Sequence, residues 1–467
     1  MRTMATELIL AVDVGAGSLR AGLVRADGRV TAAAAIPLAI REPRRGWAEF
    51  DPEHWWHAFV AATTRVLRAL PKSGRVAAVC VCGLTRTQVL LDRRRRPLGP
   101  ALLFRDRRAA EFAVGGLTAF DAPARLAWIE RHQPARFARI DRVVEPKDFL
   151  NFRLTGVIAG DTVTHSREPS PATALAQCDL VDPWQAVGAV EPAAPALARI
   201  AGAPVFAGSM DTWASAVGSG AVNPGQAYDV AGTSEAVGLV TAARHTVAGL
   251  VSLAWTERAY QAGGPTQAGA DCARWCHETF RVRGALPGAI ERAGRLARRE
   301  DRPLFLPYLS GERAPVWNSA VRAAFHGVDR ASAPDDFLWA VLEGVAMAVR
   351  DIVQHASEGT GTQPSELRVC GGGARSNAWC QLKADVLAVP VVRSSQAETG
   401  VIGAASAAAV GLALFDSVSD AAAKMAGAAR TFAPHREAAA FYDRRAAGYR
   451  RIKEAALALA SAGKRVT

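Results

Sequence analysis

Leu8-Ile-Leu-Ala-Val-Asp-Val-Gly-Ala-Gly-Ser18 decides the fold, together with a second stretch, Tyr228-Asp-Val-Ala-Gly-Thr-Ser234, that repeats its pattern. Each stretch is an extended run, a carboxylate and a turn of small residues whose backbone N–H groups can approach phosphate oxygens. The aspartates, Asp13 and Asp229, are separated by close to half of the 467 residues. This predicts two similar domains that each offer one phosphate-binding hairpin to a shared cleft. The alternative at this point is a chance recurrence of small-residue turns in a chain with 41 glycines.

The composition is that of a globular protein with sizeable cores. With 50% hydrophobic and 21% charged residues, a chain of 467 residues accommodates two or three domains. The N-terminus lacks the pattern of an export signal, and Glu7 interrupts its short apolar run. The longest uncharged stretch, 400–415, is shorter than the roughly 18 apolar residues of a membrane span, so it predicts a buried helix. We therefore expect a cytoplasmic protein without a membrane partner.

The net charge of +12 and the pI near 9.8 raise the question of nucleic-acid binding. The excess is mostly arginine spread along the chain, without interleaved aromatic residues or a recognisable binding module. The one dense run, Arg93-Arg-Arg-Arg96, precedes Pro97 and reads as a solvated turn, with a recognition patch as the alternative. No nucleic-acid partner is predicted.

The order of predicted elements favours a mixed α/β sheet that occurs twice. The first half predicts strands at 8–14, 20–25 and 29–36, a helix from Pro52 to Leu70 and a buried strand at 76–81. The hairpin pattern restarts at 227–230 and 236–241, followed by a helix at 335–354, a strand at 367–370 and a helix from Ser376 or Asn377. Asn223-Pro-Gly225 marks the boundary, so the predicted domains are 1–222 and 223–467.

Phosphoryl transfer needs groups that neutralise phosphates, a carboxylate for Mg²⁺ and a base for the attacking hydroxyl. Asp13, at the end of a buried strand, is the candidate to hold Mg²⁺ through water. The turn Gly232-Thr233-Ser234 is the candidate for the β- and γ-phosphates. Asp211, delivered by a strand to a small-residue tip before an Ala-rich helix, is the candidate base. The alternative role for Asp211 is an N-cap of that helix, and the two roles can coexist.

At this point the sequence resembles the FGGY family of carbohydrate kinases over residues 8 to about 415. The segments that carry the resemblance are Phe305-Leu-Pro-Tyr-Leu-Ser-Gly-Glu-Arg-Ala-Pro315 through Gly327, Cys370-Gly-Gly-Gly-Ala-Arg-Ser-Asn377, Gly46-Trp-Ala-Glu-Phe-Asp-Pro52, Glu145-Pro-Lys-Asp-Phe-Leu-Asn-Phe-Arg-Leu-Thr-Gly156, Leu342-Glu-Gly-Val345 and Glu398-Thr-Gly-Val-Ile-Gly-Ala404. Within the family, xylulokinases look most similar, especially over 128–156 and the segment from Phe305.

The resemblance implies two ribonuclease-H-like domains of the actin, sugar-kinase and Hsp70 type that flank a central cleft. It implies ATP and Mg²⁺ as cofactors and a small sugar as substrate, with Asp211 as general base. The implied phosphate- and nucleotide-binding residues are Asp13, Gly15, Ser18, Gly232, Thr233, Ser234, Gly371, Gly372, Gly373, Ala374 and Asn377, and the implied substrate-binding residues are Thr85, Arg86, Asp106, Asp211 and Thr212. If the chain associates, a homodimer is the expected assembly.

Departures from the family pattern concern the substrate. Where xylulokinases usually carry Gln-Met-His-Gly, this chain has Leu84-Thr-Arg-Thr87, and the usual Trp-Asn-Asp-Gly-Arg is Phe104-Arg-Asp-Arg-Arg108. An arginine fork in a pocket favours a carboxylate or phosphate, so Arg86 and Arg105 raise the hypothesis of an acidic substrate. The alternative is an internal ion pair of Arg86 with Asp106 or another acid. The chain between Arg108 and Pro123 is also shorter than expected.

The predicted function is therefore ATP-dependent phosphorylation of a small sugar, with a pentulose such as xylulose as the expected substrate. The alternatives are a kinase of an acidic sugar or polyol, a non-catalytic sugar or nucleotide sensor on the same fold, and an actin-like ATPase that acts on protein partners. The presence of both Asp13 and Asp211 argues against a sensor.

Overall fold

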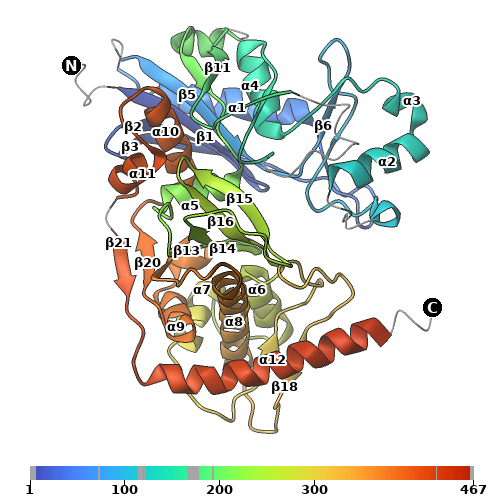
Figure 1. Cartoon of the computed structure of the whole chain (residues 1–467), viewed down its shortest axis with the longest axis vertical. Helices are drawn as coiled ribbons and strands as arrows, with labels where there is room; N and C mark the ends of the chain where they lie inside the picture. Colours follow the sequence, from blue (N-terminus) through green and yellow to red (C-terminus); the bar gives the residue numbers. More distant parts are fainter. Residues whose placement is uncertain are drawn as a thin grey trace. The chain divides into compact units, whose positions relative to one another are not determined.

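The computed structural model describes residues 7–71, 74–113, 119, 121–165, 178–191, 194–427 and 429–462. The chain divides into two compact units: unit 1 holds 1–218 and 400–426, and unit 2 holds 219–399 and 427–467 (Figure 1). The predicted domains 1–222 and 223–467 have nearly the same first boundary, whereas 400–426 packs with unit 1. Within the described ranges, none of the helices combines the length and the apolar character needed to cross a bilayer.

Unit 1 is built on a six-stranded sheet with the order β11-β12-β5-β1-β2-β3. Its strands are β1 (Leu8–Val14), β2 (Ser18–Arg25), β3 (Val30–Pro37), β5 (Val76–Gly83), β11 (Ala186–Ala189) and β12 (Pro204–Phe206). β1, β2 and β3 form an antiparallel meander, whereas β1, β5 and β12 run parallel. The carboxyl ends of these three parallel strands therefore lie at one edge of the sheet.

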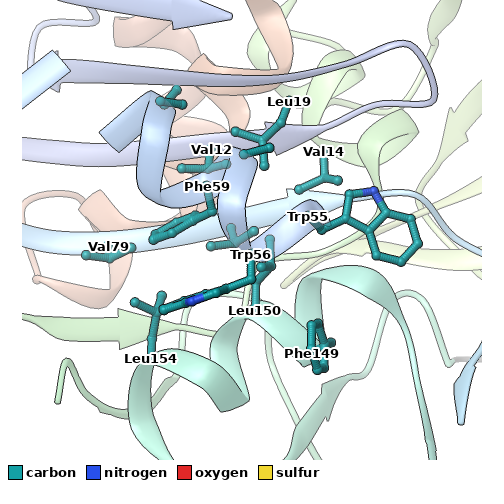
Figure 2. Packing of buried hydrophobic residues seen from close by; sticks show 14 of the residues in the cluster. Val12, Val14, Leu19, Trp55, Trp56, Phe59, Val79, Phe149, Leu150 and Leu154 are labelled. Carbon is teal, nitrogen blue, oxygen red and sulfur yellow. The ribbon is translucent and has the colours of Figure 1, made fainter. Parts of the chain in front are cut away.

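Helices cover both faces of this sheet. α1 (Pro52–Leu67) begins after Asp51, whose carboxylate accepts the N–H of Glu53, and its buried residues recur at helical spacing. The core that α1 and α4 (Pro146–Thr155) form against the sheet includes Val12, Val14, Leu19, Trp55, Trp56, Phe59, Val79, Phe149, Leu150 and Leu154 (Figure 2).

The opposite face is covered by a helix from the far end of the sequence, α10 (Thr399–Gly411), with α5 (Asp211–Gly218) and α11 (Val418–Met425) beside it. Gly22 points away from α1, because Ala21 and Leu23 face it. A Cβ at Gly22 would lie 2.7 Å from Val401 Cγ1, so the sheet and α10 are in close contact. The buried helix expected at 400–415 is confirmed over 400–411, where α10 ends.

Smaller elements complete unit 1. They are the strand pairs β4 (Glu49–Phe50) with β7 (Ala101–Leu102), β6 (Val89–Leu91) with β8 (Arg142–Val144) and β9 (Ala159–Asp161) with β10 (Asp179–Val181), and the helices α2 (Ala122–His132) and α3 (Pro134–Phe137). Part of the loop after Arg108, namely 114–118 and 120, lies outside the described residues.

Unit 2 repeats the same arrangement on a seven-stranded sheet with the order β15-β16-β14-β13-β19-β20-β21. Its strands are β13 (Gln226–Ala231), β14 (Glu235–Thr241), β15 (Val251–Thr256), β16 (Ala259–Pro265), β19 (Glu366–Cys370), β20 (Val391–Ser394) and β21 (Ala429–Phe432). β13, β19 and β20 are parallel, and β13 and β14 form the predicted second hairpin. The expected mixed α/β class with two ribonuclease-H-like units is confirmed.

The helices of unit 2 form two layers. α8 (Pro334–Thr360) and α9 (Asn377–Leu387) pack on the sheet through residues that include Val349, Val353 and Ala384. α6 (Ala270–Thr279), α7 (Leu286–Ala293) and α12 (Ala438–Ala462) share a second core with α8, beside the pair β17 (Leu304–Leu306) and β18 (Ala324–His326). The predicted helix at 335–354 is confirmed as α8, which continues to Thr360, and the helix predicted from Ser376 or Asn377 begins at Asn377 with Ser376 as its N-cap.

Candidate active site

Asp13 is the last residue but one of β1, at the carboxyl end of this strand. It is opposite Arg20 of β2 and Cys82 of β5, and it is 5% exposed. The following turn is closed by the N–H of Gly15, which donates to the carbonyl of Ser18 at 3.0 Å. Arg20 Nη1 is 3.8 Å from Asp13 Oδ2, so one cation neighbours this carboxylate.

Asp211 is brought to the same edge by the loop 207–210, which follows β12. Gly208 has φ +63°, and a Cβ there would lie 2.0 Å from the carbonyl oxygen of Val81, so only glycine fits this turn. Gly83 donates its N–H to the carbonyl of Ser209 at 3.1 Å, and Gly83 pairs with Met210 in a parallel bridge. The loop thus continues beside β5 and delivers Asp211 as the first residue of α5.

The carboxylate of Asp211 is held at the start of its own helix. Thr212 donates its backbone N–H to Asp211 Oδ1 at 2.7 Å, and its hydroxyl lies 3.4 Å from the same oxygen. Burial raises the pKa of Asp211 to about 6, against the hydrogen bonds from Thr212, which act to lower it. A carboxyl with such a pKa accepts a proton at neutral pH more readily than an ordinary aspartate.

The segment 84–87 follows the end of β5 and lies beside the end of β1. Leu84 donates its N–H to the carbonyl of Val14 at 2.9 Å, which places Thr85 and Arg86 directly after this contact with β1. Arg86 has φ +52°, a left-handed conformation that is uncommon for a residue with a side chain. Its N–H and that of Thr87 donate to the carboxylate of Glu145, at 2.9 and 3.1 Å. Arg125 Nη1 donates to the Arg86 carbonyl at 2.6 Å.

Asp106 is fully buried, and its two oxygens accept four hydrogen bonds. Three come from the backbone N–H, Nε and Nη2 of Arg108 at 3.0, 2.9 and 2.7 Å, and one comes from the N–H of Ala48 at 2.7 Å. These bonds use the roughly four lone-pair positions of a carboxylate. A pair of Arg86 with Asp106 is therefore not supported, and a pair of Arg86 with another acid stays a prediction. Arg105 forms an exposed ion pair with Glu42 at 2.6 Å.

In unit 2, the turn Gly232–Ser234 follows β13 and is held by the start of α6. Ala270 and Asp271 donate their N–H groups to the carbonyls of Gly232 and Thr233, both at 3.1 Å. Arg313, from the segment that resembles the family signature, donates from Nη2 to Ser234 Oγ at 3.2 Å and to the Thr266 carbonyl at 2.7 Å.

A buried ion cluster lies next to this turn. Lys383 Nζ contacts Asp229 Oδ2 and is 2.8 Å from Glu235 Oε1, and all three side chains are buried. Burial beside Asp229 raises the pKa of Glu235. Because the cation on α9 joins the last part of β13 to the first residue of β14, it fixes the ends of the turn between them.

The glycine loop after β19 is adjacent to the same turn. β13 and β19 pair in parallel, with Val230 opposite Cys370. Gly371 has φ +87°, and a Cβ there would lie 2.6 Å from the Ala231 carbonyl oxygen. Arg393 donates to the carbonyl of Ala374 at 2.8 Å and to Asn377 Oδ1 at 3.0 Å. Unit 2 therefore brings together the residues predicted for the phosphates and for adenosine, namely 232–234, 371–374 and 377.

The predicted residues thus form two groups, one in each unit. Unit 1 gathers Asp13, the segment 84–87 and Asp211 with Thr212 at the carboxyl ends of β1, β5 and β12. Sequence reasoning assigned no role to Glu145, Arg125, Lys147, Arg313 or Lys383, which hold these loops. The available signal was a charged residue at a position where its neighbours are apolar, as for Lys383 between Leu382 and Ala384.

The donor set at Asp13 fits Mg²⁺ held mostly by water. In the part of the chain that the structure describes, no three His, Cys, Asp or Glu side chains are grouped so that they could hold a metal ion. A single carboxylate at a strand end, with the remaining oxygen ligands supplied by water and phosphate, is the mode in which Mg²⁺ binds in phosphoryl-transfer enzymes. The residues therefore fit Mg²⁺ and do not fit a closed structural metal site.

Comparisons with known proteins find the same family in both halves of the chain. The model of the FGGY family of carbohydrate kinases, N-terminal domain, matches residues 8–115, and that of its C-terminal domain matches 227–412. The xylulose kinase of Escherichia coli (strain K12) is 30% identical in an alignment of 423 positions that covers 81% of this chain and 84% of that protein. The L-xylulose/3-keto-L-gulonate kinase of the same strain is 26% identical in an alignment of 492 positions that covers 96% of this chain and 97% of that protein. A crystal structure of a xyloylose kinase from Brucella ovis superposes with a TM-score of 0.88 at 26% identity, over 97% of this chain and 100% of that one.

Gly400 tests how closely α10 approaches Asp13. A Cβ at this position would lie 2.3 Å from Asp13 Oδ2, whereas a Cβ at Gly17 would meet nothing within 4 Å. We expect Gly400→Ala to lower the free energy of unfolding by about 1–3 kcal/mol, the usual cost of overpacking. Urea denaturation measures this, with Gly17→Ala as the control. Equal urea concentrations at the midpoint of unfolding for the two variants would contradict the close contact of Gly400 with Asp13.

Proposed function

The chain belongs to the FGGY family of carbohydrate kinases and is a sugar kinase, and we propose that it transfers the γ-phosphate of ATP to a hydroxyl of a pentulose such as xylulose. The observation that carries the proposal is the grouping of Asp13, the segment 84–87 and Asp211 at one edge of the unit 1 sheet. The names of the relatives support a pentulose, since similarity to proteins named xylulose kinase extends over most of the chain. We expect the reaction to take place in the cytoplasm.

In this proposal Asp211 is the general base. Its carboxylate removes the proton of the attacking hydroxyl, and the Thr212 N–H keeps Oδ1 oriented while it does so. Asp13 would hold Mg²⁺ through water, and when bound this ion would neutralise charge on the transferred phosphoryl group. We assign orientation of the sugar to the segment 84–87. The bond from the Leu84 N–H to the Val14 carbonyl places this segment beside the end of β1, next to Asp13.

On the nucleotide side we assign the phosphates to Gly232–Ser234 and adenosine to the loop 371–374 with Asn377. The turn offers small residues, two hydroxyls and backbone N–H groups, which suit phosphate oxygens. The glycines allow a flat ligand to approach the backbone beside β19. We also assign phosphate binding to Gly15 and Ser18, in the turn after β1.

A second candidate substrate is an acidic sugar. Two observations favour it: Arg86 is half-buried in the sugar-facing segment, and one relative is named for 3-keto-L-gulonate as well as L-xylulose. A guanidinium group binds a carboxylate through paired hydrogen bonds, whereas a neutral pentulose offers only hydroxyl and carbonyl groups. Arg86 is the candidate that would recognise the acid, because it lies in the segment 84–87, directly after the contact of Leu84 with Val14 at the end of β1.

The substrate is tested by ADP release with a panel of ketoses, polyols and aldonates. We expect the highest kcat/KM with a pentulose, and Arg86→Met is expected to leave neutral sugars nearly unaffected while lowering activity on any acidic sugar. An unchanged preference between neutral and acidic sugars in Arg86→Met would reject a role for Arg86 in selection. ATP-binding without sugar-stimulated ADP release would identify a sensor instead.

Asp211→Asn tests the base. We expect kcat to fall by on the order of 10² or more, with ATP affinity nearly intact, because a general base usually contributes that much. The wild-type kcat/KM should rise with pH through about 6, since only the deprotonated carboxylate accepts the proton. Steady-state kinetics between pH 5 and 8 measures both effects. Near-normal turnover of Asp211→Asn would remove Asp211 from this role.

Gly371→Ala tests the adenosine loop. The variant places a methyl group 2.6 Å from the Ala231 carbonyl oxygen at φ +87°. We expect ATP affinity to fall by on the order of tenfold or more, because a small displacement of a positioning loop is costly. Gly361→Ala is the matched control, since Gly361 also has positive φ (+71°) but its Cβ would meet nothing within 4 Å. Equal affinities, measured by calorimetry, would contradict the assignment.

A further inference from the structure

The first turn of α4 carries two buried charged side chains that contact different loops of the sugar site. Glu145 directly precedes the helix, and Lys147 lies on its first turn. Both are at least nine-tenths buried, at 9% and 1% relative exposure. Burial of a charged group is costly unless its hydrogen bonds are satisfied, so each invites the question of what it holds.

Glu145 holds the sugar-facing segment. Its two carboxylate oxygens accept the N–H groups of Arg86 and Thr87, one each. Arg125 donates to the carbonyl of Arg86, so this peptide is fixed through both its donor and its acceptor groups. The left-handed backbone of Arg86, at φ +52°, persists because these contacts determine it.

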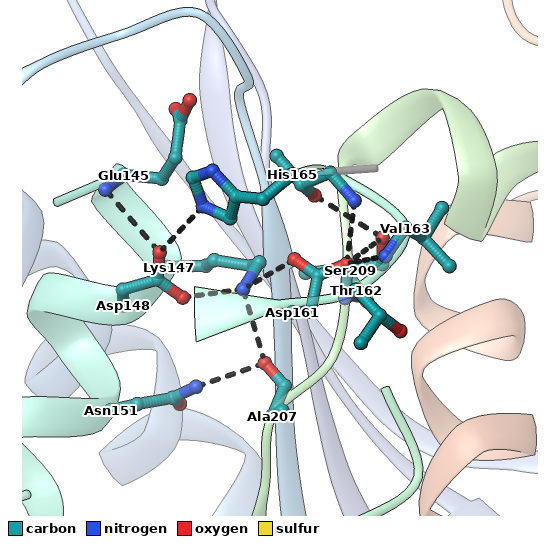
Figure 3. Close-up of polar contacts among 12 residues, drawn as sticks. Glu145, Lys147, Asp148, Asn151, Asp161, Thr162, Val163, His165, Ala207 and Ser209 are labelled. Carbon is teal, nitrogen blue, oxygen red and sulfur yellow. Dashed lines mark hydrogen bonds and ion pairs between the residues drawn. The ribbon is translucent and has the colours of Figure 1, made fainter. Parts of the chain in front are cut away.

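Lys147 holds the loop before the base. Its ammonium group contacts Asp148 and is 2.9 Å from Asp161 Oδ2 and 3.5 Å from the carbonyl of Ala207 (Figure 3). Asn151, one turn further along α4, donates to the same carbonyl at 3.0 Å.

A hydrogen bond continues from this cluster toward Asp211. Ser209 donates its hydroxyl to Asp161 Oδ1 at 2.8 Å, and Asp161 Oδ1 also accepts the N–H groups of Val163 and Thr164 (Figure 3). Ser209 is two residues before Asp211, and its carbonyl accepts the N–H of Gly83. The loop 207–210 is therefore fixed at Ala207 and Ser209, which leaves little freedom for the residue that begins α5.

We propose that the first turn of α4 positions both parts of the sugar site: Glu145 is a positioning residue for the segment 84–87, and Lys147, through Asp161 and Ser209, is a positioning residue for Asp211. The inference rests on the proposed function. A buried ion cluster is weak evidence of stability, because apolar side chains of similar volume often stabilise as well or better. Backbone groups of two loops at the end of one sheet are, in contrast, what these particular charges engage.

Glu145→Gln tests the first half. The amide keeps one acceptor oxygen and turns a donor toward the other N–H, so we expect the sugar KM to rise by about tenfold, the effect of roughly one unsatisfied buried hydrogen bond. The ATP KM should stay within about twofold of wild type, since both Glu145 bonds go to the segment 84–87 and none goes to the residues assigned to ATP. Glu53→Gln is the matched control, because Glu53 pairs with Arg153 at the other end of α4, at 2.7 Å. A lower melting temperature or kcat with an unchanged sugar KM would overturn this half.

Ser209→Ala tests the second half with a minimal change that removes only the hydroxyl bonded to Asp161. We expect kcat to fall several-fold, the sugar KM to stay within about twofold, and the acid limb of the pH–kcat/KM profile to move away from that of the wild type. A loss of folded protein alone would lower kcat without moving the pH profile. Wild-type kcat and pH profile in this variant would overturn the link to Asp211.

The proposed function and this inference fail in distinguishable ways. If none of the pentuloses stimulates ADP release by the wild type, the proposed substrate is wrong. The variant-to-wild-type ratios of the kinetic constants are then measured with the compound that does stimulate ADP release. If the wild type phosphorylates xylulose while both variants keep wild-type sugar kinetics, the proposed function stands and the positioning role is rejected.

Discussion

The parallel pairing of β1 with β5 and of β5 with β12 is the constraint on which the catalytic proposal depends. Parallel strands end at the same edge of the sheet, so the pairing of their backbones is enough to bring residues from three distant parts of the sequence side by side. Asp13 follows from β1, the segment 84–87 from β5 and Asp211 from β12. In unit 2 the pairing of β13 with β19 does the same for the turn 232–234 and the loop 371–374.

A buried lysine in each unit contacts the loop or turn that adjoins a strand end. In unit 1, Lys147 joins Asp148 and Asp161 and reaches the loop before Asp211. In unit 2, Lys383 joins Asp229 and Glu235 at the two ends of the turn 232–234. In both units a buried lysine lies between two carboxylates next to a loop at the end of a strand. Desolvation makes such clusters expensive, and their hydrogen-bond geometry makes them directional.

The strands and major helices could be predicted because local patterns carry them. Alternation and turn residues placed β1 to β3 and the hairpin β13–β14 within two residues, and Asp51 with Pro52 marked the start of α1. The return of α10 to unit 1 could not be predicted, because an Ala/Gly-rich helix looks equally buried in either unit. The supports Glu145 and Lys147 were equally out of reach, since they act across about 60 residues on loops whose positions only the assembled sheet defines. The contacts of Asp106 with Arg108 and Ala48 likewise depend on tertiary packing.

The return of residues 400–426 to unit 1 has a consequence for synthesis on the ribosome. Chains emerge from the N-terminus and domains generally fold as they appear, yet unit 1 lacks one of its covering helices until residues 219–399 of unit 2 have been made. During that interval the face of β2 around Gly22 and the surface of α5 around Ala214, which α10 contacts in the finished protein, are open to other nascent chains or to chaperones. Unit 1 is thus completed only after residues 219–399 of unit 2 have been translated, and a chain that ends before residue 400 has a unit 1 sheet without α10 on one face.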